Sequence, residues 1–160
     1  GSEMFIRDRP IIYQQNKIST NENGKMLDIS NASIKFQNIN FSYKSNLNNI
    51  VLKDINIDIA GRKMTALVGH SGSGKSTILN LIPRIYDADS GEILIDNQKV
   101  QNLNLKSLRK EISIVDQNTT LFDDTIFNNI KYAKPDASDE EIFTAANISM
   151  CTDFIEKLVN

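Results

Sequence analysis

The feature that most constrains this chain is an eight-residue segment, Gly69 to Ser76, which reads G-H-S-G-S-G-K-S. It fits the pattern G-x-x-x-x-G-K-[S/T], in which glycines allow the backbone to point successive N–H groups at one anion. An apolar run, Met64 to Val68, precedes the segment, and helically spaced apolar residues follow it from Thr77 to Tyr86. The pattern therefore predicts a buried strand, a phosphate-binding loop and a helix, which is an α/β nucleotide-binding arrangement.

The polar positions of this loop have defined chemical roles. Lys75 brings an ammonium group to the β- and γ-phosphates of a nucleotide, and the Ser76 hydroxyl can ligate Mg²⁺. The positive end of the following helix attracts the same phosphates. We therefore predict a nucleotide site formed by Gly69, His70, Ser71, Gly72, Ser73, Gly74, Lys75, Ser76 and Thr77.

The composition is that of a folded globular chain. Of 160 residues, 40% are hydrophobic and 24% are charged, which excludes a disordered chain. A formal net charge of -2 argues against a nucleic-acid partner, and no apolar stretch is long enough to span a membrane. The single cysteine, Cys151, forms no internal disulfide and has no partners for a zinc site.

The chain divides by pattern into residues 1–30, 31–118 and 119–160. The first part reads as a polar connector behind Gly1-Ser2, which resembles a tag scar, and the abrupt C-terminus suggests a segment of a longer protein. In the second part we expect strands at Ile34 to Tyr43 with a phase slip at Asn38, at Ile55 to Ile59, at Met64 to Val68, at Ile93 to Ile95 and at Ile112 to Val115.

Helices are expected over Thr77 to Tyr86, where Pro83 should kink or shorten the helix, and over Leu105 to Lys110. In the third part, Thr125 and Thr152 are candidate caps, and Ser138 to Glu141 forms a capping box. The apolar positions of these last helices are predicted to be the core of a helical subdomain.

Two residues outside the loop are candidates for the same site. Tyr43, at the end of an aromatic-containing strand, could stack on an adenine ring, although an ordinary strand aromatic fits the spacing as well. Gln117 follows an apolar strand, at the edge where α/β sheets bind ligands, and could reach Mg²⁺ or the attacking water, or be a plain loop glutamine.

Other charged groups have simpler interpretations. The acid pairs Asp123-Asp124 and Glu140-Glu141 are predicted to cap helices or to be solvated. The basic residues Arg84, Arg109 and Lys110 are predicted to be surface charges rather than a phosphate clamp.

Taken together, four segments resemble the nucleotide-binding domain of ATP-binding cassette (ABC) transporters, and in particular bacterial exporters of the lipid A and multidrug half-transporter type. The resemblance runs from about Ile34 to the last residue. It is carried by Phe41-Ser42-Tyr43, Gly69 to Thr77, Asp87 to Ile93 and Val115 to Phe122.

The resemblance implies a P-loop NTPase fold with an antiparallel β-subdomain, part of a parallel core sheet and the start of a helical subdomain. It implies that Tyr43 stacks on adenine, that Gly69 to Thr77 is the Walker A loop and that Gln117 is the Q-loop glutamine. ATP and Mg²⁺ are the implied ligands, with Ser76 and Gln117 on the metal and Lys75 and Gln117 the only catalytic-site residues within this chain.

The resemblance also implies partners for the intact protein. These are a second nucleotide-binding domain placed head to tail and the coupling helices of a membrane domain, contacted by residues 120–129 at the cytoplasmic face of the bacterial inner membrane. The chain ends before the family's signature motif, Walker B strand, D-loop and switch histidine, and His70 is not that histidine. We therefore expect this chain to bind ATP without turning it over.

Two alternatives remain open from the sequence. A small-molecule kinase would share the phosphate loop, but such kinases usually begin with it, whereas here strands and Tyr43 come first. A cassette protein with no transport role, such as a soluble ATP-driven clamp or a translation factor, would share the other motifs as well. Only residues 1–30, which the resemblance implies are a connector from the membrane domain, and residues 120–129 argue against it.

Overall fold

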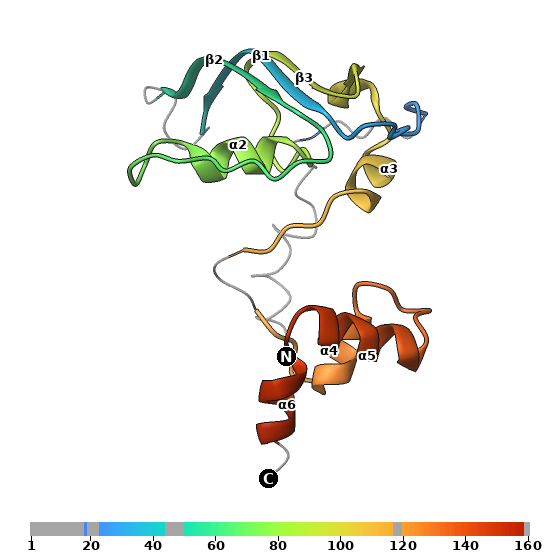
Figure 1. Cartoon of the computed structure of the whole chain (residues 1–160). Helices are drawn as coiled ribbons and strands as arrows, with labels where there is room; N and C mark the ends of the chain where they lie inside the picture. Colours follow the sequence, from blue (N-terminus) through green and yellow to red (C-terminus); the bar gives the residue numbers. More distant parts are fainter. Residues whose placement is uncertain (1–17, 19–22, 44–49, 117–119, 159–160) are drawn as a thin grey trace, which may run out of the picture. The chain divides into compact units, whose positions relative to one another are not determined.

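The computed structural model describes residues 18, 23–43, 50–116 and 120–158 (Figure 1). The chain forms two compact units, residues 1–113 and 114–160. The first contains β1 Ile34–Ser42, β2 Ile50–Ile59, α2 Lys75–Leu81, β3 Ser90–Ile95, β4 Gln98–Lys99, the 3-10 helix η1 Val100–Asn102 and α3 Leu105–Lys110. The second contains α4 Ile126–Lys131, α5 Asp139–Ile148 and α6 Thr152–Leu158.

The first unit is built on a four-stranded antiparallel sheet in the order β2-β1-β3-β4. Its central strand, β1, shifts register against both neighbours after residues 36 and 37, and Asn38 has a φ of 51°. The Asn38 N–H donates to the side chain of Asn56 at 2.9 Å, so the bulge is satisfied by a neighbouring strand. This confirms the phase slip predicted at Asn38.

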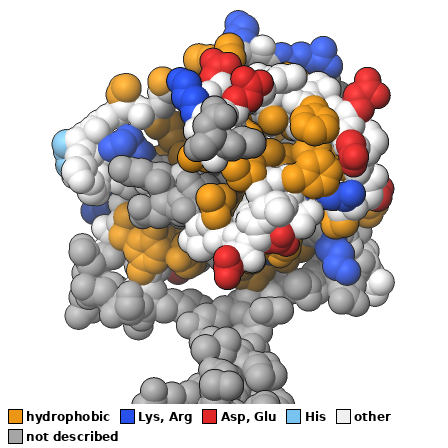
Figure 2. Space-filling view, turned by 90° about the horizontal axis from the view of Figure 1, so that it is seen from below, with side chains coloured by type: hydrophobic (Ala, Val, Ile, Leu, Met, Phe, Trp, Pro, Cys, Tyr) orange, Lys and Arg blue, Asp and Glu red, His pale blue; other side chains and the backbone are white. Residues whose placement is uncertain are grey.

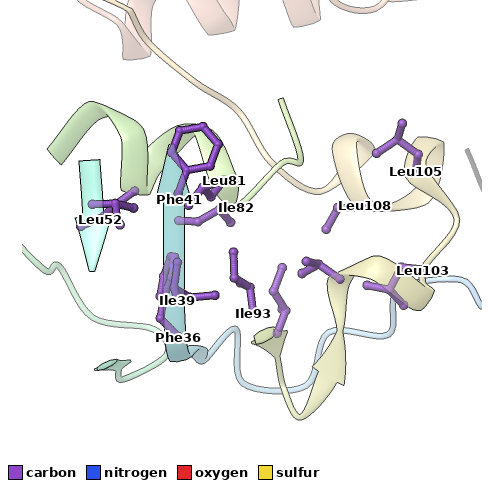
Figure 3. Packing of buried hydrophobic residues seen from close by; sticks show 13 residues of the cluster. Phe36, Ile39, Phe41, Leu52, Leu81, Ile82, Ile93, Leu103, Leu105 and Leu108 are labelled. Carbon is purple, nitrogen blue, oxygen red and sulfur yellow. The ribbon is translucent and has the colours of Figure 1, made fainter. Parts of the chain in front are cut away.

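The core lies between this sheet and its helices. Helix α2 runs along one face of the sheet in Figure 1, and Figure 3 shows Leu81 and Ile82 beside Phe41 of β1. Leu103 and Leu108 extend the same cluster toward η1 and α3. Helix α2 ends at Leu81, before Pro83, as the proline predicts, because a proline in the next turn removes a backbone donor.

Two predicted strands are wrong. Residues 64–68 and 112–115 form no strand in the described structure, and Met64, Val68 and Val115 expose 101%, 90% and 96% of their surface. An apolar run becomes a strand only where neighbouring strands supply hydrogen-bond partners, and neither run has such a neighbour among the described residues. The expected parallel core sheet is therefore not formed here.

The second unit is held by helix caps and a small core. The Thr125 hydroxyl accepts from the Asn128 N–H at 3.1 Å, and Ser138 with Glu141 forms the predicted capping box before α5. Thr152, the third predicted cap, is the first residue of α6. The predicted apolar core is smaller than expected: Ile142 is buried in α5, whereas the neighbouring Phe143 is exposed. A unit this short cannot enclose most of its apolar side chains.

Both units have exposed apolar side chains. Figure 2 shows such side chains in patches between charged groups on one face of the molecule. None of the helices in the described part of the chain has the length and apolar character needed to cross a membrane.

A carboxylate fixes the segment that leads into β1. Asp96 accepts hydrogen bonds from the backbone N–H groups of residues 30 to 33 at 2.8–2.9 Å. The bonds from Asn31 and Ser33 hold the pKa of the Asp96 carboxyl well below its usual range. Asp96 and Asn97, with φ of 44° and 63°, form the two-residue turn between β3 and β4, so the hairpin aims this carboxylate at the segment.

We expect Asp96→Asn to lower the free energy of unfolding at neutral pH and to remove part of its acid dependence. A carboxyl with a lowered folded-state pKa stabilises the fold above its unfolded pKa, near 3.8, and this stability is lost as pH falls through the folded-state value. Urea unfolding at pH 7 and near pH 3 should therefore show a difference between variant and wild type that shrinks in acid. Asp58→Asn, in an exposed ion pair with Lys35, is the control, and an equal effect of both variants would contradict the assignment.

Candidate functional site

The loop between residues 69 and 76 contains two glycines in a backbone conformation that phosphate-binding loops use. Gly72 and Gly74 adopt φ of 80° and 86°, the left-handed region in which side chains are strained, whereas Gly69 does not. A Cβ on Gly74 would lie 2.6 Å from Leu52 Cδ2 of β2, so glycine lets the buried end of the loop approach the sheet without displacing this side chain. A Cβ on Gly72 would meet nothing within 4 Å, so the space beside this residue is open.

Lys75 is held inside the curve of this loop. Its Nζ donates to the carbonyl oxygens of Gly69 and His70 at 2.9 and 2.8 Å and to Ser73 Oγ at 3.3 Å. The ammonium group is therefore held in position by the loop itself, beside the residues from Gly69 to Ser73. The Ser76 hydroxyl is on an exposed residue in the first turn of α2. A polyphosphate with Mg²⁺ fits this set, because it needs a cation, glycine-shaped backbone and one hydroxyl ligand.

The remaining loop positions are exposed and serve the loop itself. His70 is exposed, and its Nδ1 lies 2.8 Å from the carbonyl oxygen of Ser71. The N–H of Ser73 donates to the His70 carbonyl at 3.3 Å. None of these contacts gives His70 a catalytic arrangement.

Tyr43 lies at the same site, which its position in the sequence left undecided. Its hydroxyl is 2.9 Å from Thr77 Oγ1, the residue that follows Ser76. Its ring makes near-perpendicular contacts with the rings of Phe41 and Tyr86, at centroid distances of 4.9 and 5.3 Å. The side chain is half-buried, so part of the ring can still meet a ligand.

Two arginines fix the turn that carries Tyr86. Arg84 forms a two-pronged ion pair with Asp87, with Nε–Oδ1 and Nη2–Oδ2 distances of 2.7 and 2.9 Å. Arg109 of α3 donates to the carbonyl oxygens of Pro83 and Arg84 at 3.0 and 2.7 Å. The surface-charge prediction is therefore wrong for Arg84, which is only 3% exposed, because its carboxylate partner makes burial of the charge tolerable.

Sequence reasoning missed Tyr86, Arg84 and Arg109 as neighbours of the site. Each sits in a segment whose pattern signals only a helix end or a short helix. The contacts of Tyr86 with Tyr43 and of Arg109 with Pro83 join parts of the chain that local patterns do not relate. Tyr86 did close the predicted helical stretch, but nothing in the spacing tied it to Tyr43.

The remaining candidates from the sequence are Gln117 and the two acid pairs, and none of them is described at the phosphate loop. Gln117 lies outside the described residues, so its predicted role stays a prediction. Of the acid pairs, Asp124 accepts from Asn128 Nδ2 and from the Thr125 N–H at 2.8 and 2.7 Å, and these bonds lower the pKa of its carboxyl. Lys134 and the Ser138 N–H lower the pKa of the Glu141 carboxyl in the same way. These two acids stabilise helix starts, as predicted.

The fold and loop together define a phosphate-loop nucleotide-binding domain with an antiparallel subdomain and helices. The sequence pattern of the family described as "ABC transporter" matches residues 52–158. The chain therefore belongs to the ABC transporter family, which excludes the small-molecule kinase considered above.

Similar proteins agree with this assignment. The chain is 47% identical over 127 residues to an "ATP-dependent lipid A-core flippase" of Legionella pneumophila, covering 79% of this chain and 21% of that protein. It is 46% identical over 127 residues to "Iron-sulfur clusters transporter ATM1, mitochondrial" of Kluyveromyces lactis, covering 79% and 17%. A solved structure of a bacterial Atm1-family ABC exporter with ATP bound superposes with a TM-score of 0.85 at 34% identity.

That superposition covers 95% of this chain and 26% of the solved one. The chain thus spans about a fifth of the length of the flippase it matches.

Proposed function

We propose that this chain binds ATP with Mg²⁺ at residues 69–77 and serves as the nucleotide-binding part of an exporter. The observation that carries the proposal is the placement of Lys75 Nζ within the loop while Tyr43 is hydrogen-bonded to Thr77 at the start of α2. A cation for phosphates and an aromatic ring for a base are thereby joined in one unit.

In this proposal each side chain has a separate task. Lys75 and the loop N–H groups hold the phosphates, Ser76 offers its hydroxyl to Mg²⁺, and Tyr43 stacks on the adenine. Bound Mg²⁺ would supply charge neutralisation at the phosphates. Gln117 would be a further ligand for the metal or its water. The solved relative with ATP bound supports ATP as the nucleotide.

For the intact protein we propose ATP hydrolysis coupled to export across the bacterial inner membrane. Two such domains would close head to tail around ATP, and residues 120–129 would contact the membrane domain.

The coupling proposal is tested by crosslinking in the intact protein. A photoreactive residue at Phe122, which is exposed, should crosslink to the membrane domain. A residue at Lys35, in the other unit and on the sheet, is the matched control. Crosslinks from neither position would instead favour a cassette protein with no transport role.

Base stacking is tested with Tyr43→Ala. We expect Mg²⁺-ATP affinity to fall about 5- to 100-fold, the range expected for one stacked base, while affinity for inorganic triphosphate changes little. Tyr43→Phe keeps the ring and should retain most ATP affinity. Calorimetric titration measures both ligands, and an unchanged ATP affinity in Tyr43→Ala would remove the stacking role.

A further inference from the structure

We propose that Tyr86 is a positioning residue for nucleotide recognition, which fixes the ring of Tyr43 in the orientation that receives the base. The inference rests on the proposed function above and concerns the same site. It assigns the adenine-recognition task to the aromatic cluster Phe41, Tyr43 and Tyr86 rather than to Tyr43 alone.

The contacts restrain both rotatable bonds of Tyr43. Its ring meets Tyr86 at an interplanar angle of 90° and Phe41 at 83°, the edge-to-face geometry that aromatic pairs prefer. Its hydroxyl is bound to Thr77 at the far end of the side chain. A tyrosine held at ring and hydroxyl loses little further freedom when a base stacks on it, so more of the stacking free energy appears as affinity.

Tyr86 itself is placed by rigid neighbours. It lies between Arg84 and Asp87, whose side chains form the two-pronged ion pair, and Arg109 donates to the carbonyl groups of Pro83 and Arg84 in the same turn. The end of β1, next to Tyr43, is tied to the segment after α2 as well, because Asp89 Oδ2 accepts from the N–H of Ser42 at 2.7 Å. The turn after α2 therefore links the phosphate loop to the residue that receives the base.

Within this cluster, Tyr86 is the member suited to tuning affinity rather than to holding the fold. Tyr86 is 40% exposed, whereas Phe41 is 3% exposed and belongs to the core. Removing Tyr86 should therefore leave the fold and the phosphate loop intact while freeing the ring of Tyr43.

The test separates base recognition from phosphate binding. Calorimetric titrations with Mg²⁺-ATP and with Mg²⁺-triphosphate are made on the wild-type chain, Tyr86→Ala and Tyr86→Phe. We expect Tyr86→Ala to weaken ATP binding about 3- to 10-fold with triphosphate affinity unchanged, and Tyr86→Phe to restore the wild-type ratio. Tyr86→Leu, which keeps apolar bulk without an aromatic ring, should behave as Tyr86→Ala and guards against a folding defect.

Tyr132→Ala is the matched control, because it removes an exposed tyrosine that contacts one aromatic ring, Phe122, in the other unit. An equal loss of ATP and triphosphate affinity in Tyr86→Ala, or no loss of either, would overturn the inference while leaving the proposed function intact. Failure of the wild-type chain to bind either ligand would overturn the proposed function and this inference with it.

Discussion

Lys75→Ala should weaken binding of Mg²⁺-ATP about 100-fold, at least as large a loss of affinity as any other single substitution in this chain should cause. The Lys75 ammonium is already placed by the carbonyl oxygens of Gly69 and His70, so its contribution to phosphate binding is not reduced by the cost of ordering a mobile side chain. Alanine would leave those carbonyl oxygens next to the phosphates without an intervening cation. Repulsion between the partial negative charges of these oxygens and the phosphate charges would then add to the lost attraction.

The effect of Lys75→Ala is measured by titration calorimetry with Mg²⁺-ATP and with Mg²⁺-triphosphate, and both affinities should fall together because the contact is to phosphate. Lys63→Ala is the control, since it removes an equal charge from an exposed residue outside the loop. If Lys63→Ala weakened binding as much as Lys75→Ala, general electrostatic attraction rather than the loop would explain the binding.

Gly61→Ala should lower the free energy of unfolding by about 3 kcal/mol, the largest stability effect expected here. A Cβ at position 61 would lie 1.8 Å from the carbonyl oxygen of Asn31, which is backbone and cannot rotate away. The segment that holds this carbonyl is itself fixed by Asp96 and by Arg62, whose Nη2 donates to the Ser30 carbonyl at 2.7 Å. The overlap can be relieved only by displacing the segment and losing those bonds.

Urea unfolding followed by circular dichroism measures this loss. Gly72→Ala is the matched comparison, because φ there is 80° but the added Cβ meets nothing within 4 Å, and backbone strain alone should cost about 1 kcal/mol. If both variants lost the same free energy of unfolding, the segment before β1 would be free to move, and its hydrogen bonds to Asp96 would not restrain it.

Local signals explain what the sequence predicted correctly. The phosphate loop, the bulge at Asn38, the cap at Thr125 and the capping box at Ser138 are each encoded within a few residues, and all of them form as expected. The stop before Pro83 is of the same kind. Such features depend on backbone geometry and on side-chain to backbone hydrogen bonds, which short sequence patterns specify directly.

Features that depend on distant partners were predicted less well. The apolar runs 64–68 and 112–115 have strand-like composition, but strand formation requires a neighbouring strand, and composition does not reveal whether one is present. Arg109 donates to the carbonyl oxygens of Pro83 and Arg84, which lie 26 and 25 residues earlier in the chain. The packing of Tyr86 against Tyr43 joins residues whose separation in sequence gives no periodic signal.

The central claim is that this chain is an ATP-binding domain by virtue of its own phosphate loop, and a calorimetric titration of the 160-residue chain with Mg²⁺-ATP tests it most directly. We predict saturable binding of one ATP per chain. The absence of saturable binding up to millimolar ATP, in a chain that circular dichroism shows to be folded, would contradict the claim.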